Sequence, residues 1–426
     1  MRSRSGLIGL VIFVLAAAAA CDSGTPSRSG SPPSTQAGHP AGHQGVTPAA
    51  TPEGLAAQFE RYLGQHTLLA VRQMRSVLTA TPDYRKAADA ELQAYTEELS
   101  QVVAAAFHDE AQGDRFQQVW EQNITHFSSY AEAVAGNDTA AREQARAALD
   151  ADADAYGSWL AEASKGRVQA SDAAKVMRTH VEHLMTQADA YAARDYAKAY
   201  RIERDAYEHM FTAGTSLAKG TLAPRNAAAL DAPAQQLRSA FAMLLGEHMQ
   251  LIIDTQRATF AGAQEFKAAA AQVNANTAAL TKGMGAIVGP RKAAEFQSAW
   301  GEHVEGLLAY STAVAGNDEA AKEAAEQNLS GVGQRLALYL SDIVRNELPV
   351  EPLTKALGEH DQHLVGQVNA YAEKRYDEAQ EMELAGYGQM LGVADTLVGA
   401  IQKTVKPQLP VGGSQTGGGG TAHEHR

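Results

Sequence analysis

The amino-acid sequence predicts an all-α protein of two homologous helical-bundle domains, each with about three antiparallel helical hairpins, giving about twelve helices. Three observations lead to this class. Between its two low-complexity ends the chain is rich in Ala, Glu, Gln, Leu and Lys, which are good helix formers. Runs of alternating β-branched residues, which would indicate strands, are almost absent. A pattern of residues also recurs at a fixed offset, as in helical repeat proteins.

The first 20 residues have the features of a secretory signal. Two arginines give a basic start, and the apolar stretch that follows is shorter than the roughly 20 residues of a membrane-spanning helix. It ends in Ala18-Ala19-Ala20-Cys21, which resembles the lipobox of bacterial prolipoproteins. The resemblance implies that residues 1–20 are removed and that Cys21 is then lipidated. Ordinary signal-peptidase cleavage after an Ala-x-Ala is the alternative.

Lipid on Cys21 would hold the exported chain at the outer face of the cytoplasmic membrane. In two-membrane bacteria of the prolipoprotein class, Asp22 resembles a signal for retention at the inner membrane. The composition, rich in Ala and Gly, favours a one-membrane host, in which Asp22 has no such meaning. Cys21 is also the only cysteine, so an internal disulfide and thiolate sites for zinc or iron–sulfur clusters are excluded.

Two low-complexity segments flank the predicted domains. Residues 21–54 carry the lipidated cysteine and then a Ser-, Pro- and Gly-rich stretch, and residues 406–426 are a Gly- and His-bearing tail, so both are expected to be disordered. The chain has a formal charge of −13. Removal of residues 1–20 deletes two arginines and no acid, which makes the charge −15. An acidic chain of this kind argues against nucleic acid as a partner.

The chain contains an internal duplication. Residues 120–138 and 300–318 share a pattern from Trp to Gly-Asn-Asp at an offset of 180. The same offset pairs His180 with His360, His183 with His363, Tyr191 with Tyr371, Glu203 with Glu383, Tyr207 with Tyr387 and Met210 with Met390. The two copies are expected at residues 55–222 and 232–405, and residues 223–231 form a proline-flanked linker.

Each copy divides again into three units. His66, Asn123 and His180 are 57 residues apart, and His248, His303 and His360 follow at spacings of 55 and 57. A candidate turn comes 13 to 15 residues after each of these positions, and Gly136-Asn137-Asp138 and Gly316-Asn317-Asp318 are the strongest. In these two, Gly can end one helix and Asp can cap the next. The unit is therefore a helical hairpin, and three hairpins could form either a closed bundle or an open array.

The histidines that recur once per hairpin have two interpretations. Each follows a large apolar residue by three positions, so each should border the core. A structural role is the first interpretation, because Asn123 takes the equivalent place in one unit and can form similar hydrogen bonds. Metal binding is the second interpretation for these repeat histidines, namely His66, His248 and His303, with His180 and His360.

The third and sixth hairpins carry the strongest candidate metal ligands. Counting from the turn places the two helices of each hairpin side by side at these positions. The third hairpin then offers His180, His183, His209 and Met210, and the sixth offers His360, His363 and Met390. Imidazole together with soft thioether favours copper. The two tails add His39, His43, His423 and His425, which can bind metal incidentally.

No sequence motif indicates catalysis. The chain has no Gly-rich phosphate loop, no Gly-x-Ser-x-Gly and no Glu-x-x-His of a di-iron bundle in the predicted domains. The predicted function is therefore non-catalytic binding or storage of a transition metal, most favourably copper, by a membrane-anchored surface lipoprotein. The alternative is a helical scaffold for another protein of the cell envelope, which predicts a contiguous exposed apolar patch.

Overall fold

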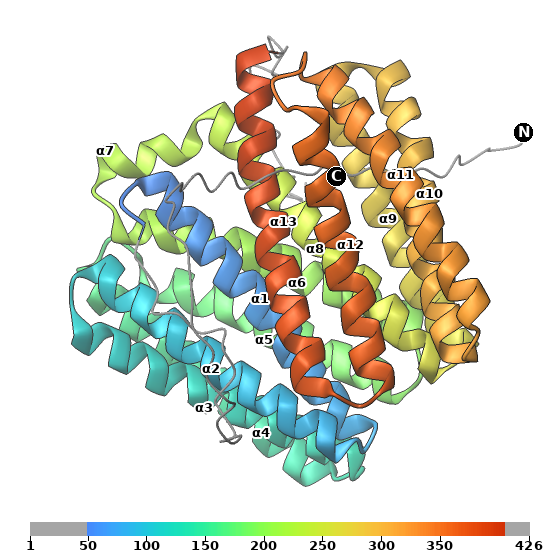
Figure 1. Ribbon diagram of the computed structural model, residues 1–426. Coiled ribbons are helices and arrows are strands. Elements are labelled where there is room, and N and C mark those ends of the chain that lie inside the picture. The colour runs from blue at the N-terminus through green and yellow to red at the C-terminus, as the bar shows by residue number, and fades with distance from the viewer. Residues whose placement is uncertain (1–48, 405–426) are drawn as a thin grey trace, which may run out of the picture.

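The computed structural model describes residues 49–404, and in this part of the chain twelve long helices form six antiparallel hairpins without any strand (Figure 1). This confirms the predicted all-α class. The hairpins pair α1 (Pro52–Leu78) with α2 (Pro82–Phe107), α3 (Glu110–Ala135) with α4 (Thr139–Ala163), α5 (Ala170–Ala192) with α6 (Tyr196–Thr221), α8 (Pro233–Ala261) with α9 (Ala263–Val288), α10 (Pro290–Gly316) with α11 (Glu319–Ile343), and α12 (Val350–Ala372) with α13 (Tyr376–Thr404).

Short capped turns join the helices within each hairpin. Asp138 and Asp318 cap the helices that follow them, each accepting a hydrogen bond from the backbone N–H three residues later. The left-handed residue in these turns is Asn137 (φ 53°) or Asn317 (φ 51°), whereas the preceding Gly136 stays right-handed at φ −79°. Asparagine tolerates this conformation better than most side chains, so the expected role of glycine falls to its neighbour.

Each half closes into a bundle, which answers the question that the sequence left open. The first and last helices of each half pack together, α1 on α6 and α8 on α13. The first helix of every hairpin also contacts its two equivalents: α1, α3 and α5 meet in one half, and α8, α10 and α12 meet in the other. We call these six the inner helices. Each half is thus a closed six-helix bundle with its hairpins arranged around three inner helices.

The ends of the two halves differ slightly from the predicted boundaries. Helix α1 begins at Pro52, inside the segment expected to be a tether, because Thr51 caps it through the backbone N–H of Gly54. The expected linker contains a four-residue helix, α7 (Pro224–Ala227), and a 3-10 turn, η1 (Ala228–Asp231). No helix within residues 49–404 is long and apolar enough to cross a membrane. Cys21 and the tail after residue 404 lie outside the described residues.

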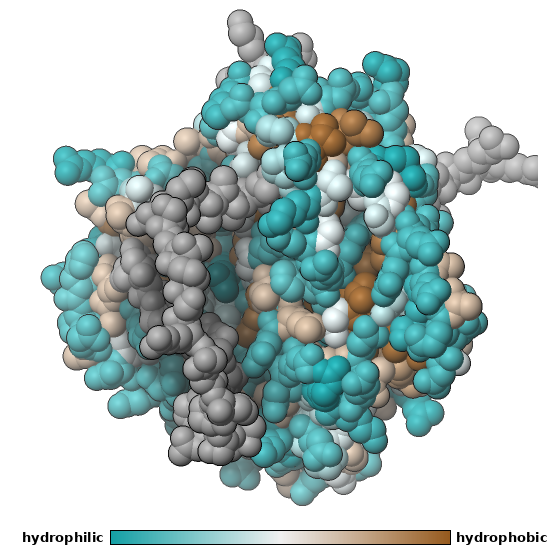
Figure 2. Space-filling view, in the orientation of Figure 1, coloured by the Kyte–Doolittle hydropathy of each residue, from teal (hydrophilic) through white to brown (hydrophobic). Residues whose placement is uncertain are grey.

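The two bundles pack on each other through their central helices. Helix α1 is buried continuously over residues 62–76 and α8 over residues 245–258, so both are enclosed on all sides. The hydroxyls of the duplicated Tyr207 and Tyr387 lie 3.0 Å apart, which marks a pseudo-two-fold relation between the halves. The face seen in Figure 2 is mostly hydrophilic, with small separate apolar areas.

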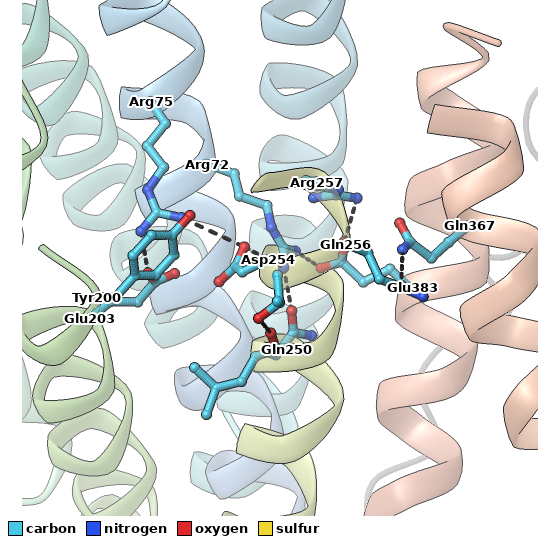
Figure 3. A network of polar contacts seen from close by, with 12 residues as sticks. Arg72, Arg75, Tyr200, Glu203, Gln250, Asp254, Gln256, Arg257, Gln367 and Glu383 are labelled. Carbon is cyan, nitrogen blue, oxygen red and sulfur yellow. Dashed lines mark hydrogen bonds and ion pairs between the residues drawn. The ribbon is translucent and has the colours of Figure 1, made fainter. Parts of the chain in front are cut away.

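Buried charges join the halves at this interface (Figure 3). Glu383 of α13 accepts a hydrogen bond from Arg257 of α8 at 3.0 Å and forms an ion pair with Arg72 of α1. Arg75, one turn further along α1, pairs with Glu203 of α6. All of these side chains are less than a tenth exposed. Because buried charges need partners, the network couples the stability of the two halves.

Glu383→Ala should lower the free energy of unfolding by about 3–5 kcal/mol, because two buried guanidinium groups lose a shared carboxylate. Denaturant unfolding followed by circular dichroism measures the change. Glu378→Ala on the same helix is the matched control, since its ion pair with Arg375 is largely exposed and should contribute less than about 1 kcal/mol. Equal losses in the two variants would contradict a coupling role for Glu383.

Candidate metal centre

The inner helices of the second half bring three histidines together. His248 of α8, His303 of α10 and His360 of α12 each offer a ring nitrogen, and these nitrogens lie within 4.8 Å of one another. The three side chains are 0–1% exposed. Among the described residues this is the one group of three or more His, Cys, Asp or Glu side chains at such distances. We call it the histidine triad.

The spacing of the triad is close to that of a metal site. The ring centroids are 6.2, 6.2 and 5.7 Å apart. Three imidazoles that bind one metal through nitrogens at about 2.0–2.1 Å would have centroids roughly 5.2–5.5 Å apart. An inward movement of less than about 1 Å between rings would therefore bring the three nitrogens to ligand distance of one ion.

Burial keeps the triad histidines in their neutral form. Desolvation lowers the pKa of His303 to about 3 and holds the pKa values of His248 and His360 well below the usual range. Neighbouring histidines in the triad lower the pKa values of His248 and His360 further. A neutral imidazole has a lone pair available, so the triad is ready to bind a cation at neutral pH without losing protons.

One aromatic and one acidic side chain lie next to the triad. The ring centroid of Trp300 lies 4.1 Å from that of His248 and 4.5 Å from that of His303. The indole N–H of Trp300 donates a hydrogen bond to Thr277 Oγ1 at 3.2 Å. Oδ1 of the Asp361 carboxyl group, on α12, lies 3.5 Å from Nδ1 of His303. Neither ring nitrogen of His248 has a hydrogen-bond partner among the described residues.

The first half has the same architecture but not the same side chains. His66, Asn123 and His180 take the three equivalent positions on α1, α3 and α5, and the rings of His66 and His180 are 5.9 Å apart. Here the indole N–H of Trp120 donates to Nδ1 of His66 at 3.1 Å. Asn123 donates to Asp152 at 3.4 Å. The first half therefore has two imidazoles and one amide, and an amide is a poor metal ligand. One of the imidazoles, that of His66, already accepts a hydrogen bond from Trp120.

The carboxyl group beside the middle position, Asn123 or His303, also differs between the halves. Asp361 stands where the duplication places Val181 in the first half, and both are buried. Asp152, the partner of Asn123, is replaced by the buried Val332 in the second half. Each half thus has one carboxyl group near its middle position, supplied by α4 in the first half and by α12 in the second.

The predicted ligands of the third hairpin fall into two groups. The rings of His183 and His209 lie 5.6 Å apart, and Nε2 of His209 donates to the Val176 carbonyl at 2.9 Å. His180 faces inward, with ring contacts to His66 and Phe127 at 5.9 and 5.7 Å. Met210 is buried in the hydrophobic core of the first half. His183 therefore lies beside His209 within the hairpin, whereas His180 points toward His66 and the other inner helices.

The sixth hairpin repeats this division. Nδ1 of His363 lies 3.2 Å from Oε1 of Gln389, whose amide donates to the Ala356 carbonyl as His209 does in the third hairpin. His360 belongs to the triad, and Met390 is buried in the core of the second half. The predicted sets within one hairpin stay predictions. The set that the structure brings within 4.8 Å comes from three hairpins instead.

The signal for the triad was present in the sequence as equal spacing. His248, His303 and His360 stand at one position of successive hairpins, and a closed three-hairpin bundle brings equal positions together around its centre. The sequence signal for Asp361 was weaker. The histidine before it is the same in both halves (His180 and His360), but Asp361 itself stands where the first half has Val181.

In comparisons with known proteins, the chain matches no protein-family model, no curated protein and no solved structure. The geometry of the described residues therefore carries the functional argument by itself.

Proposed function

We propose that this chain is a membrane-anchored surface lipoprotein that binds or stores a transition-metal ion, without catalysis, at His248, His303 and His360. The convergence of three buried and neutral imidazoles within 4.8 Å carries the proposal. Burying a polar ring costs free energy unless it gains a partner. A metal ion at the centre of the triad would supply such a partner to His248, whose nitrogens have none among the described residues.

Copper is the ion that we favour. Imidazole is a good ligand for both copper and zinc. Structural zinc sites almost always have four protein ligands, whereas three side chains converge here among the described residues. A buried set of three imidazoles therefore suits copper better than structural zinc.

Metal titration of the lipid-free mature chain tests the proposal, with the tail histidines removed so that they cannot contribute. Cu(I) under reducing conditions and Zn(II) are the two probes. We expect one copper ion per chain, bound more tightly than zinc. Metal uptake that disappears with the tail histidines would overturn the proposal, and tighter zinc binding would overturn the choice of copper. The substitutions are His39→Ala, His43→Ala, His423→Ala and His425→Ala.

Asp361→Asn should weaken metal binding by about 10- to 100-fold, because a cation at the triad would favour the ionised form of Asp361, and the carboxylate, 3.5 Å from Nδ1 of His303, would then orient that ring. Competition with a chromophoric Cu(I) chelator measures the affinity. Asp152→Asn, in the first half, is the matched control and should leave the copper affinity unchanged. An Asp361→Asn chain with wild-type affinity and an unaltered metal spectrum would contradict this role.

Cys21→Ser should release the protein from the membrane fraction, because the proposed lipid attachment needs the cysteine side chain. Fractionation of cells followed by immunoblotting measures the distribution. Equal membrane association of the wild-type and variant chains would contradict lipid anchoring at this residue.

No specific observation among the described residues favours the alternative of a helical scaffold for another envelope protein. Among the described residues, Phe260 and Leu338 are the exposed large hydrophobic side chains, and they belong to α8 and α11. A docking surface for another envelope protein therefore stays a prediction from the sequence.

A further inference from the structure

A solvent-open cavity of about 380 Å³ lies between the two halves, next to the buried charges of Figure 3. Its wall includes residues of α1, α6 and α8 and shares no side chain with the histidine triad. The volume falls within the range of small-molecule sites, which occur preferentially at domain interfaces.

The cavity wall follows the pseudo-two-fold relation of the halves. Arg75 and Arg257 are equivalent in the duplication, and both line the cavity. The Arg75 guanidinium lies 5.0 Å from the ring centre of Tyr191, and the Arg257 guanidinium lies 5.2 Å from that of the equivalent Tyr371. Stacking on aromatic rings holds each planar guanidinium in place, so the two cations are preorganised.

Hydrogen-bond donors exceed acceptors in this wall. The Nε atoms of Arg72, Arg75 and Arg257 are buried and have no hydrogen-bond partner among the described residues. Oε1 of Glu265 already accepts from the hydroxyls of two tyrosines at 2.9 Å. Oδ2 of Asp254 is the unpartnered acceptor. Three guanidinium groups and two carboxylates line the cavity, and Glu383 and Glu203 pair with these arginines from outside the lining, so the surplus is one of N–H donors and not of charge.

The cavity wall also has aromatic side chains. Tyr196 and Tyr371 line it, and Phe260, which is 39% exposed, lies in the same wall. An inorganic oxyanion would satisfy the guanidinium donors but would make no use of the apolar ring surface that these side chains present to the cavity. The wall therefore matches a molecule with both an anionic and an apolar part.

We propose that this cavity binds a small organic acid, whose carboxylate accepts hydrogen bonds from Arg72, Arg75 and Arg257 and whose apolar body packs on the tyrosine and phenylalanine rings. Charge-assisted hydrogen bonds to a carboxylate are strong and directional, which gives the site its selectivity for an acid. The proposal is independent of metal binding at the triad.

Isothermal titration of the lipid-free mature chain with four probes tests the ligand class. Benzoate carries both parts, benzyl alcohol lacks the charge, acetate lacks the ring, and benzylamine reverses the charge. We expect benzoate to bind one to one and about ten-fold or more tightly than the other three, since hydrogen bonds to charged groups contribute this much. Absence of saturable benzoate binding in the millimolar range, or equal binding of benzyl alcohol, would overturn the proposal.

Variants of the wall locate the site. Arg257→Gln should weaken benzoate binding about ten-fold or more. Arg142→Gln is the matched control, because Arg142 also stacks on a tyrosine and pairs with a carboxylate but lies outside the cavity. Phe260→Ala, at a partly exposed residue outside the ion network, should weaken benzoate but not acetate and should leave the fold intact. Equal effects of the two arginine variants, or benzoate binding that is unchanged in Phe260→Ala, would place binding elsewhere.

Discussion

His303→Asn should abolish high-affinity copper binding, because it leaves two imidazoles and an amide where three imidazoles converge. The loss should exceed the roughly 10- to 100-fold cost of removing a partner that only supports a ligand. The substitution recreates the side chains that the first half carries at its three equivalent positions. Competition with a Cu(I) chelator, on the chain without tail histidines, measures the affinity.

His66→Asn is the control for this experiment. It removes an equally buried histidine, but one from the first half, and should leave copper affinity unchanged. If the two variants bound copper equally well, the triad would not be the site.

The reverse substitution, Asn123→His, should create a second copper site in the first half. Both ring nitrogens of His180 are without a hydrogen-bond partner among the described residues and are available as ligands, whereas His66 has to give up the hydrogen bond from Trp120 to offer a nitrogen lone pair at Nε2. The larger side chain should cost about 1–3 kcal/mol of stability through overpacking. A stoichiometry that rises from one to two copper ions per chain is the expected result. A folded variant that still binds one ion would show that three imidazoles at these positions are insufficient.

Acid should unfold the protein steeply between pH 6.5 and 5, because five inner-helix histidines are buried and neutral. Their folded-state pKa values are depressed below the unfolded value of about 6.5, to about 3 for His66 and His303. Below pH 6.5 the unfolded chain therefore binds more protons than the folded chain. This contribution to stability is complete above pH 6.5 and is lost as the pH falls toward the folded-state pKa values.

Two buried carboxyl groups oppose this effect, because they release protons on unfolding. Burial raises the pKa values of Glu203 and Asp361, so the folded state holds protons there that the unfolded state has released. Five histidines against two carboxyls leave a net uptake of about three protons on unfolding. Stability should then fall by about 4 kcal/mol per pH unit, which is large compared with the 5–15 kcal/mol of a typical domain.

Denaturant unfolding at pH 7.5, 6.5, 5.5 and 5.0 measures this slope. In His303→Asn the slope should decrease by about 1.4 kcal/mol per pH unit, since asparagine does not protonate. A stability that stayed flat across this range would contradict burial of the five histidines in neutral form. Copper bound to the triad should protect the wild-type chain from acid, because a ligand of the folded state adds to its stability.

The sequence was sufficient for the local parts of the fold. Helix formers, Asp caps and turn residues act within a few positions of each other, so the twelve helices and their hairpin turns could be placed from residue patterns alone. Asp138 and Asp318 are examples, since each caps the helix that was expected to follow it. The start of α1 at Pro52 could not be placed as well, because the segment before it has no apolar periodicity.

The candidate site could be predicted only in part. The sequence singled out every triad histidine as a repeated residue, but it grouped His360 with side chains of its own hairpin. That grouping follows from proximity along the chain, and His363 does meet Gln389 across the hairpin turn. The inward direction of His360, and the part played by Asp361, depend on packing between hairpins that the chain order does not reveal.

The sequence by itself thus determined an all-α chain of six hairpins, the duplication, and one polar residue per hairpin at the edge of the core. The tertiary structure decided that three hairpins close around their first helices, and that equal positions of different hairpins then meet in the centre. It also decided that the arginines of α1 and α8 lie at a buried interface and line a cavity. The physical reason is that closure and docking are set by contacts between residues far apart in the chain, whereas helical periodicity and capping are local.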